Sequence, residues 1–416
     1  MRAMLLRAAL ALTLLAHAAH AQAPALAPAA AREAAPRLLV LRGDLLASTR
    51  ARVRGGDPSL KPAVDALVHD ADRALREGPF TVTAKKRVPA SGDRHDYMSV
   101  GPYWWPDPSR PNGLPYVRRD GQRNPETTND YDSPRQAAMV DAVETLALAG
   151  YLTGNAAYTD RAAYLLRVWY LDPATRMNPN LRFGQAVPGR TEGRGTGIID
   201  THRLVRLADA LGLLAASGRW PAAEQQGVRD WMRAYLGWLR DSKIGRDEQR
   251  SANNHGSWYD AQVAALALYV GDTATARSTL ERAKTLRIVR QIRPDGRQPL
   301  ELARTRSLHY SVFNLDALMD LAEMGRKVGV DLWGYRSPQG GSIRGALDYV
   351  APYADPAKKW PGQEITTIEP DLLLEPLRRA RAAYGGDAYA APLARIPASA
   401  VSASRVQLLY PEVTRP

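Results

Sequence analysis

The feature that most constrains the fold of this chain is a repeated pattern of two helices joined by a glycine turn. Residues 146–155 read LALAGYLTGN and residues 264–272 read AALALYVGD. In both segments an apolar helix closes at a glycine, and a second helix begins directly afterwards. Such recurring pairs are typical of an open solenoid or of a closed α/α toroid. The repeat therefore predicts an all-α fold built from helix–turn–helix pairs and leaves both arrangements open.

Helical periodicity continues along most of the chain. Ser133 and Pro134 read as an N-cap followed by proline at the first helical position, which predicts a helix that ends at Gly154. Strand-like alternation occurs in two short candidates, residues 38–41 and 406–410. Further helices are expected at about 157–170, 201–216, 221–240, 257–270, 273–286 and 311–325.

Two long segments lack this periodicity. Residues 93–132 contain many proline, glycine and aromatic side chains, and residues 178–197 contain asparagine, glutamine, arginine and glycine. Loops of this length inside a compact helical domain are usually functional or disordered. Because aromatic content argues against disorder, we expect both segments to be active-site loops.

Residues 1–21 read as a leader for export. Arg2 and Arg7 supply positive charge, residues 8–16 form a short apolar run, and residues 19–21 read Ala-His-Ala, the small-x-small pattern of a cleavage site. The run is too short to cross a bilayer, and no other stretch is long and apolar enough. We therefore expect no membrane span, with a retained N-terminal anchor as the alternative.

Cleavage after Ala21 leaves a chain with a simple organisation. An alanine- and proline-rich linker, residues 22–36, is followed by a single domain, residues 37–416. The leader predicts a periplasmic protein, with secretion as the second choice.

Composition excludes several classes of function. The chain has no cysteine, so it has neither disulfides nor thiolate metal sites. Its histidines lack metal-binding spacing, and no cofactor motif is present, so we expect neither metal nor cofactor. The formal net charge is +13, which in an exported protein favours a polyanionic carbohydrate or an anionic surface over nucleic acid as partner. The alternative is that the arginine-rich surface merely reflects a GC-rich genome. We expect a monomer, or at most a weak homo-oligomer.

Four polar side chains with complementary chemistry lie in two short motifs. Asn254 and His255 are adjacent, and Arg304 and Tyr310 follow about fifty residues later. An amide, an imidazole and a guanidinium can neutralise a carboxylate, and a phenol beside an arginine can act first as base and then as acid. These groups are what proton removal from a carbon next to a carboxylate requires.

Each of these residues also has a plain structural interpretation. Asn253 or Asn254 can cap the following helix, Arg304 can pair with Glu301, and Tyr310 can pack in the core. A spacing of six residues does not place Arg304 and Tyr310 on one helix face. Part of 304–310 is therefore expected to be a turn or a helix entry.

Further candidates for substrate contacts surround these motifs. The aromatic trio can stack on sugar faces or anchor a loop, and the amides can bind sugar hydroxyls or form turns around Pro179. The candidates are Tyr103, Trp104, Trp105, Asn178, Asn180, Gln185, Asn253, Trp258, Tyr259, Arg306 and His309.

Several motifs in fixed order carry a resemblance to a known family. They are Tyr-Trp-Trp-Pro-Asp-Pro (103–108), Thr-Arg-Met-Asn-Pro-Asn (175–180), Asn-Asn-His-Gly (253–256), Glu-Leu-Ala-Arg-Thr (301–305), Tyr310 with Phe-Asn-Leu (313–315), and Gly-Val-Asp-Leu-Trp (329–333). From about residue 95 to residue 353 the chain resembles the alginate lyase family, polysaccharide lyases with an α/α toroid or incomplete barrel. The Tyr-Trp-Trp-Pro form and the Arg-to-Tyr spacing look closer to the mannuronan and glucuronan branch.

The resemblance implies a role for each residue of the two motifs. Asn254, His255 and Arg304 would neutralise the carboxylate of a 4-linked uronate, and Tyr310 would transfer the proton. In β-elimination a base removes H5, the bond to O4 breaks and a C4=C5 double bond forms. Mannuronate and glucuronate carry H5 and O4 on one side of the ring, so Tyr310 can serve as both base and acid. Guluronate carries them on opposite sides, which would make His255 the base.

The proposed base needs a shifted pKa. A free tyrosine has a pKa near ~10, and lowering it by ~2 units requires roughly 2.7 kcal/mol of differential stabilisation. Arg304 has the correct sign of charge, so we expect it to lower the pKa of Tyr310.

Two other classes of function remain open from the sequence. One is a periplasmic polyuronate-binding protein that has lost its chemistry, and the other is a glycoside hydrolase on an α/α toroid, which would need two carboxyl groups across one cleft. The polymer, the endo or exo mode of cleavage and the oligomeric state do not follow from the residues.

Overall fold

Four helices form the inner layer of the fold: α3 (Asp132–Thr153), α5 (Leu204–Ala216), α8 (Asn254–Val270) and α12 (Ser307–Val328). The computed structural model describes residues 35–128 and 130–412. Helix α3 packs on α5, α5 on α8 and α8 on α12. Most side chains of α8 are buried on every side, as expected for a helix that other helices surround.

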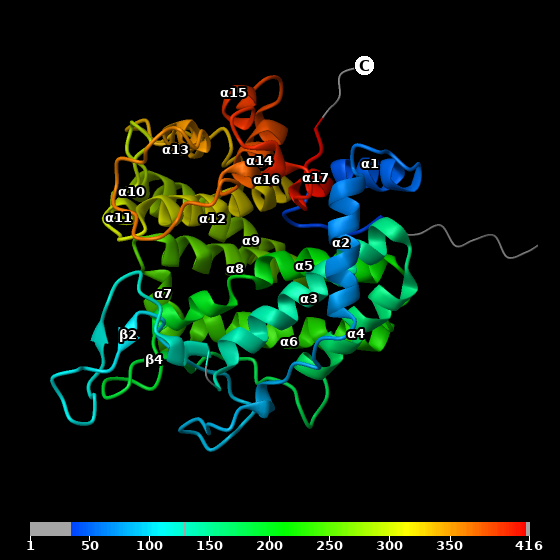
Figure 1. Cartoon of the computed structure of the whole chain (residues 1–416). Helices are drawn as coiled ribbons and strands as arrows, with labels where there is room; N and C mark the ends of the chain where they lie inside the picture. The colour runs from blue at the N-terminus through cyan, green and yellow to red at the C-terminus, as the bar shows by residue number, and fades with distance from the viewer. Residues whose placement is uncertain (1–34, 129, 413–416) are drawn as a thin grey trace, which may run out of the picture. The chain divides into compact units, whose positions relative to one another are not determined.

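A second layer of helices covers the first. These helices are α4 (Ala156–Tyr170), α6 (Ala222–Asp241), α9 (Thr273–Ala283) and α13 (Ile343–Val350). Helix α4 packs on α3, α6 and α9 on α8, and α13 on α12. In Figure 1 the helices of the two layers alternate along the colour scale, from α3 in cyan-green to α13 in orange. The expected all-α fold is confirmed, and its arrangement is that of an α/α toroid.

The glycine turns of the repeat have the predicted structure. Gly154 and Gly271 end α3 and α8 with φ of 79° and 90°, in the left-handed region that glycine adopts without strain. The side chains of Asn155 and Asp272 then cap α4 and α9 by accepting from backbone N–H groups. Both repeated segments therefore form the same kind of connection, from an inner helix to an outer helix.

Helices from the two ends of the described chain pack together. Helices α1 (Gly43–Arg54) and α2 (Lys61–Ala74) pack on α3, and α14 (Leu374–Tyr384) packs on α12. Helix α17 (Val406–Leu409) contacts α1, α2 and α14, where blue and red meet in Figure 1. The remaining helical segments are short: η1 (Val82–Ala84), η2 (Pro125–Thr128), η3 (Gly195–Thr201), α7 (Lys243–Gln249), η4 (Lys284–Ile288), α10 (Val289–Gln291), α11 (Pro299–Leu302), η5 (Ala351–Ala354), α15 (Ala390–Leu393) and α16 (Ala398–Val401).

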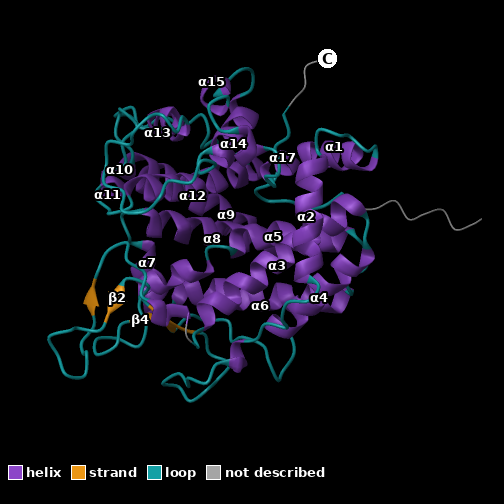
Figure 2. Ribbon diagram, viewed as in Figure 1, coloured by secondary structure: helices purple, strands orange, loops and turns teal. Residues whose placement is uncertain are grey.

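Short strands lie in the two segments that were expected to be loops. Strand β1 (Met98–Val100) pairs in parallel with β4 (Phe183–Ala186). Strand β2 (Trp104–Trp105) pairs antiparallel with β3 (Val117–Arg118). Figure 2 shows the strands in orange at one end of the helical body. Pairing of β1 with β4 joins the two long segments to each other.

Both strand predictions were wrong. Residues 39–41 form a bend and have no partner strand, because the carboxylate of Asp209 accepts the backbone N–H groups of Leu39, Val40 and Leu41. Residues 406–409 form α17, which is surrounded by helices and has no strand edge beside it.

Helix starts were also predicted imperfectly. Ser133 is not the N-cap of α3, because the helix already begins at Asp132, and Pro134 is tolerated because first-turn N–H groups need no helical partner. Helices α8 and α12 begin several residues earlier than expected, at Asn254 and Ser307. This shift places both chemical motifs at helix N-termini.

Most of the predictions for residues 1–36 concern residues that the structure does not describe. Residues 1–21 and most of the linker 22–36 lie outside the described residues. Within residues 35–128 and 130–412, no helix has both the length and the apolarity needed to cross a bilayer.

Candidate active site

A cleft of about 860 Å³ opens where the two long segments meet the N-termini of α8 and α12. Asn254 and His255 line it from the first turn of α8. Arg304 lines it from the turn that precedes α12, and Tyr310 from the first turn of that helix. The expected turn before Tyr310 is thus present, and it brings four residues from two motifs to one cavity.

Each member of the Asn-His pair is held from behind by a buried glutamate. Glu301 accepts hydrogen bonds from the backbone N and from Nδ2 of Asn254, both at 2.7 Å. Glu248 accepts from Nδ1 of His255 at 2.6 Å. Both glutamates are 1% exposed. Because a carboxylate can only accept, Nδ1 carries the hydrogen and Nε2 is left for a ligand.

Arg304 pairs with Asp120 and not with Glu301. Its Nε and Nη2 donate to the Asp120 carboxylate at 3.0 and 2.7 Å, and Thr305 Oγ1 donates to the Asp120 carbonyl oxygen at 3.0 Å. Partial burial raises the pKa of Asp120, but the hydrogen bonds and charge of Arg304 outweigh it and hold that pKa well below its usual range. The ion pair fixes the guanidinium against the first long segment.

Tyr310 lies directly beneath this guanidinium. The Arg304 Cζ is 3.6 Å from the centre of the Tyr310 ring, and the Tyr310 hydroxyl donates to Tyr103 Oη at 2.7 Å. Burial raises the pKa of Tyr310 above its usual range, Tyr103 adds to the rise, and Arg304 opposes it. The expected net lowering of this pKa by Arg304 was therefore wrong, because desolvation of the phenolate exceeds the effect of one cation.

Other charged groups line the same cleft. The carboxylate of Asp200 accepts from Tyr97, Ser99 and Gln185, and burial raises its pKa. Burial also raises the pKa of Asp316 to about 7. The additional cations along the wall are Arg118, Arg123, Arg194, Arg203 and Arg306. Their excess over the acids makes the cleft suited to a polyanion.

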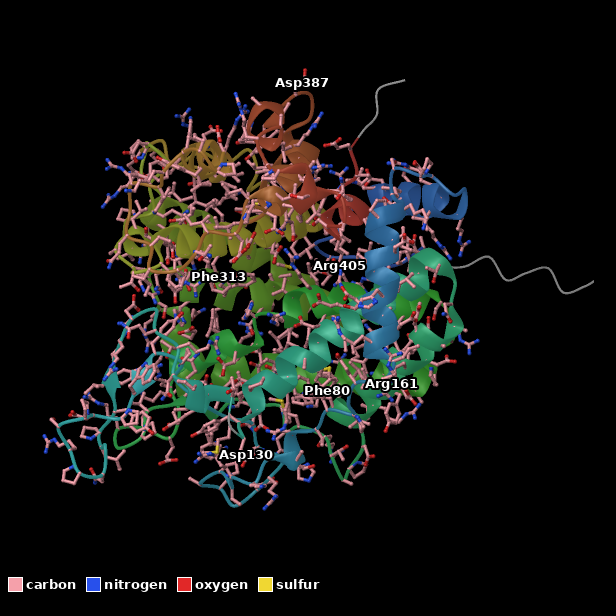
Figure 3. All side chains as sticks on the ribbon, in the orientation of Figure 1. Phe80, Asp130, Arg161, Phe313, Asp387 and Arg405 are labelled. Atoms are coloured by element: carbon pink, nitrogen blue, oxygen red, sulfur yellow. The ribbon has the colours of Figure 1, made fainter. Side chains whose placement is uncertain are left out.

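His202 is a further histidine of the cleft lining, beside His255 and His309. His202 Nδ1 donates to the carbonyl oxygen of Ile199 at 2.7 Å. Its ring meets the rings of Trp258 and Phe313 edge-on, with centroids 5.0 and 5.3 Å apart. Phe313, on α12, is labelled in Figure 3. Burial lowers the pKa of His202 to about 4.

The predicted substrate-contact residues divide into two groups. The cleft is lined by Tyr103, Trp104, Gln185, Asn253, Arg306 and His309. Outside its lining lie Trp105, Asn178, Asn180, Trp258 and Tyr259.

The tryptophans of the first long segment have arginine neighbours. Arg190 and Arg194 lie over the Trp104 ring, 5.3 and 5.6 Å from its centre, and Arg119 lies 5.1 Å from the centre of Trp105. Both rings are half-buried, and Trp104 also lines the cleft.

The amides and the α8 aromatics outside the cleft have structural partners. Asn178 and Asn180 donate through Nδ2 to Asp96 at 2.9 and 3.0 Å. Trp258 is 4% exposed, and Tyr259 donates its hydroxyl to the carbonyl oxygen of Leu239. The turn-forming and core interpretations therefore describe these four residues.

Several residues of the site carry no local sequence signal. His202 lines the cleft, whereas Asp120 and Glu248 are not part of its lining and instead bind Arg304 and His255, which are. No motif in the sequence around these three residues marks them for the site. Within the described parts of the chain, no group of three or more His, Cys, Asp or Glu side chains is arranged to hold a metal ion.

Comparisons with known proteins agree on one family. The sequence profile described as alginate lyase matches residues 81–360. No curated protein sequence matches the chain. Alginate lyase A1-III from Sphingomonas species A1 shares 18% identity over 88% of this chain and 94% of its own, with a TM-score of 0.56, and so shares the fold. Another structure of A1-III, a variant in complex with a tetrasaccharide, aligns with a TM-score of 0.59.

A nearer relative extends this match over almost the whole chain. The crystal structure of an alginate lyase from Bacteroides ovatus covers 90% of this chain and 99% of its own, with 38% identity and a TM-score of 0.86. With the profile matching more than half of the chain, this protein belongs to the alginate lyase family and is a polysaccharide lyase.

Proposed function

We propose that this lyase cleaves 4-linked polyuronates of the alginate type by β-elimination, with mannuronan or glucuronan preferred and Tyr310 as base and acid. The observation that carries the proposal is that Asn254, His255, Arg304 and Tyr310 all line one cation-rich cleft. The name of the Bacteroides ovatus relative supports alginate as the polymer.

Carboxylate neutralisation falls to the Asn-His pair together with Arg304. Glu301 fixes Asn254 through hydrogen bonds from its backbone N and its Nδ2, and Glu248 directs His255 Nε2 toward the ligand. To donate to a carboxylate from Nε2, His255 must carry hydrogen on both ring nitrogens, and the negative charge of Glu248 balances the imidazolium. A preorganised pair stabilises the charge that develops on the substrate carboxylate as H5 leaves, without reorganisation during the reaction.

Proton transfer falls to Tyr310. A phenolate next to Arg304 can take H5, and the same residue can return the proton to O4 when both lie on one side of the sugar ring. Because the pKa of Tyr310 is raised, the hydroxyl is protonated in the free enzyme at neutral pH. Its hydrogen bond to Tyr103 at 2.7 Å holds the reacting oxygen in place beside Arg304.

The variant Tyr310→Phe tests the assignment. It keeps the ring beneath Arg304 and removes only the hydroxyl, so we expect no ultraviolet-absorbing unsaturated product from mannuronan or glucuronan. Binding of the polymer, measured by calorimetry, should persist. Tyr164→Phe is the matched control, since Tyr164 lies under Arg161 at 5.1 Å on the outer helix α4. Strong residual formation of product by Tyr310→Phe would refute the role of this residue.

A panel of polymers tests the preference. Mannuronan and glucuronan should be cleaved faster than guluronan, and any guluronan cleavage should survive Tyr310→Phe but not His255→Ala. Equal rates on all three polymers, all lost with Tyr310→Phe, would contradict the proposed geometric basis of the preference.

We also propose that residues 1–21 direct the protein to the periplasm. The charge of Arg2 and Arg7, the apolar run after them and the Ala-His-Ala sequence support this. The mature protein should begin at Gln22, which mass spectrometry of the periplasmic fraction would test; an uncleaved chain in the cytoplasm would contradict it.

A further inference from the structure

His202 lies one helical turn below the groups proposed to react. Trp258, which contacts its ring, follows Asn254 by one turn of α8, and Phe313 follows Tyr310 by one turn of α12. His202 is therefore wedged between the two helices that carry the reacting side chains. It lines the same cleft, and the elimination described above gives it no role.

The hydrogen-bonding state of this imidazole is set by its surroundings. The Ile199 carbonyl can only accept, so Nδ1 carries the hydrogen and Nε2 presents a lone pair. Within the described residues, Nε2 has no hydrogen-bond partner. Burial and the nearby charges of Arg203 and Arg206 lower the pKa of His202 to about 4, so the ring is neutral when the enzyme works near neutral pH.

The uncharged Nε2 of His202 presents a lone pair to the cleft, which favours ligand groups that donate a hydrogen bond. It repels a carboxylate and attracts an O–H donor. Within a chain of 4-linked uronates, the ring hydroxyls on C2 and C3 are the available donors. Positions below the carboxylate-binding pair, one turn along each helix, are where the body of the same sugar ring would extend.

We propose that His202 Nε2 accepts a hydrogen bond from the 2- or 3-hydroxyl of the uronate whose carboxylate faces Asn254 and His255. This inference rests on the proposed function and adds a residue that determines specificity. An O-acetylated uronate has no hydrogen to donate at that position and is bulkier, so His202 makes the enzyme discriminate against acetylated polymer.

Two substitutions of His202 distinguish the role of Nδ1 from the role of Nε2. In His202→Asn the short amide can reproduce the Nδ1 contact with Ile199 and removes the acceptor in the cleft. In His202→Gln the longer side chain can place an oxygen near the Nε2 position and loses the Ile199 contact. His69→Asn, on the exposed surface of α2, is the matched control.

The quantity to measure is the ratio of kcat/KM for oligomannuronate to that for the same oligomer acetylated at O2 or O3. One neutral hydrogen bond corresponds to a change of roughly tenfold. We expect His202→Asn to lower kcat/KM about tenfold on the plain oligomer and much less on the acetylated one, so that the ratio falls. His202→Gln should retain most of the wild-type ratio, and His69→Asn all of it.

The outcomes distinguish this inference from the function on which it rests. An unchanged ratio in folded His202→Asn, or equal losses of the ratio in the Asn and Gln variants, would overturn the role of His202. If the Asn variant does not fold, a ratio of the two kcat/KM values that falls well below the wild-type ratio in a folded Gln variant also overturns the role of His202. If the wild type forms no unsaturated product from any polyuronate, the proposed function fails. Calorimetry with the same two oligomers then still reports whether His202 discriminates between them.

Discussion

Replacement of Asp120 by asparagine tests how the proposed site positions its guanidinium. Asp120 binds Arg304 through two guanidinium nitrogens at 3.0 and 2.7 Å, in a pair whose side chains are 22% and 13% exposed. A hydrogen bond to a charged group contributes about 1.5–3 kcal/mol, and a neutral one about 1 kcal/mol. Asparagine keeps one acceptor oxygen, so we expect a net loss of about 2 kcal/mol. If this whole loss raises the activation free energy, kcat/KM decreases roughly thirtyfold.

The direction of the change is what makes the experiment decisive. If Asp120 positions Arg304 over the Tyr310 ring, turnover falls in Asp120→Asn and KM changes less. If Asp120 only masks a positive charge, its neutralisation frees Arg304 for the substrate, and affinity for the anionic polymer rises without loss of turnover. Initial rates of unsaturated-product formation across a range of oligomannuronate concentrations separate the two cases. Asp107→Asn is the control, because it removes the same charge from the same loop and its carboxylate binds Ser109.

Two further predictions concern the phenol and the loop that contacts it. Because the pKa of Tyr310 is raised, the basic form is a minor species that grows with pH, so log kcat/KM should rise with a slope of about one from pH 6 to pH 9; a plateau beginning near pH 7 would contradict a raised pKa. Gly121→Ala should lower the melting temperature and kcat together, since Gly121 has a φ of 72° and an added Cβ would collide with Thr305 Oγ1. Gly218→Ala, with a φ of 69° and open space around it, should lose stability only through backbone strain, and equal effects of the two variants would show that the Thr305 contact is unimportant.

Local sequence rules were sufficient for the helix–turn–helix pairs, whereas their arrangement as a toroid was implied only by the family resemblance. The turns at Gly154 and Gly271 depend on a left-handed residue followed by a side chain that caps the next helix, and both requirements are met within three residues. The start of α12 was harder to place, because Ser307 and Leu308 lack a strong N-cap signal, and the N–H of Leu308 is satisfied by Glu364 from a distant loop.

Contacts between residues far apart in the chain could not be predicted from the sequence. Asp120 and Arg304 are separated by 184 positions, and nothing in the composition around Asp120 marks it as the partner of that arginine. The same applies to residues 38–41, whose apolar run predicts a strand until the carboxylate of Asp209 is seen to take its N–H groups. In both cases the side chain or backbone group binds an aspartate from a distant segment, and not the neighbouring residue or strand that the local sequence suggests.

The pairing with Asp120 also changes how the work is divided within the site. The family resemblance implied that Arg304 neutralises the substrate carboxylate, and its charge was expected to activate Tyr310. Two of its three guanidinium nitrogens, Nε and Nη2, are taken by Asp120, and its face lies against the phenol. Three of its five N–H groups remain without a partner among the described residues, both on Nη1 and one on Nη2. One N–H from each of these nitrogens forms an outer edge that can bind a uronate carboxylate in bidentate geometry while the Asp120 pair is intact. The carboxylate can therefore be shared between this edge and the pair Asn254 and His255, while the face of the guanidinium acts on the charge that forms on Tyr310.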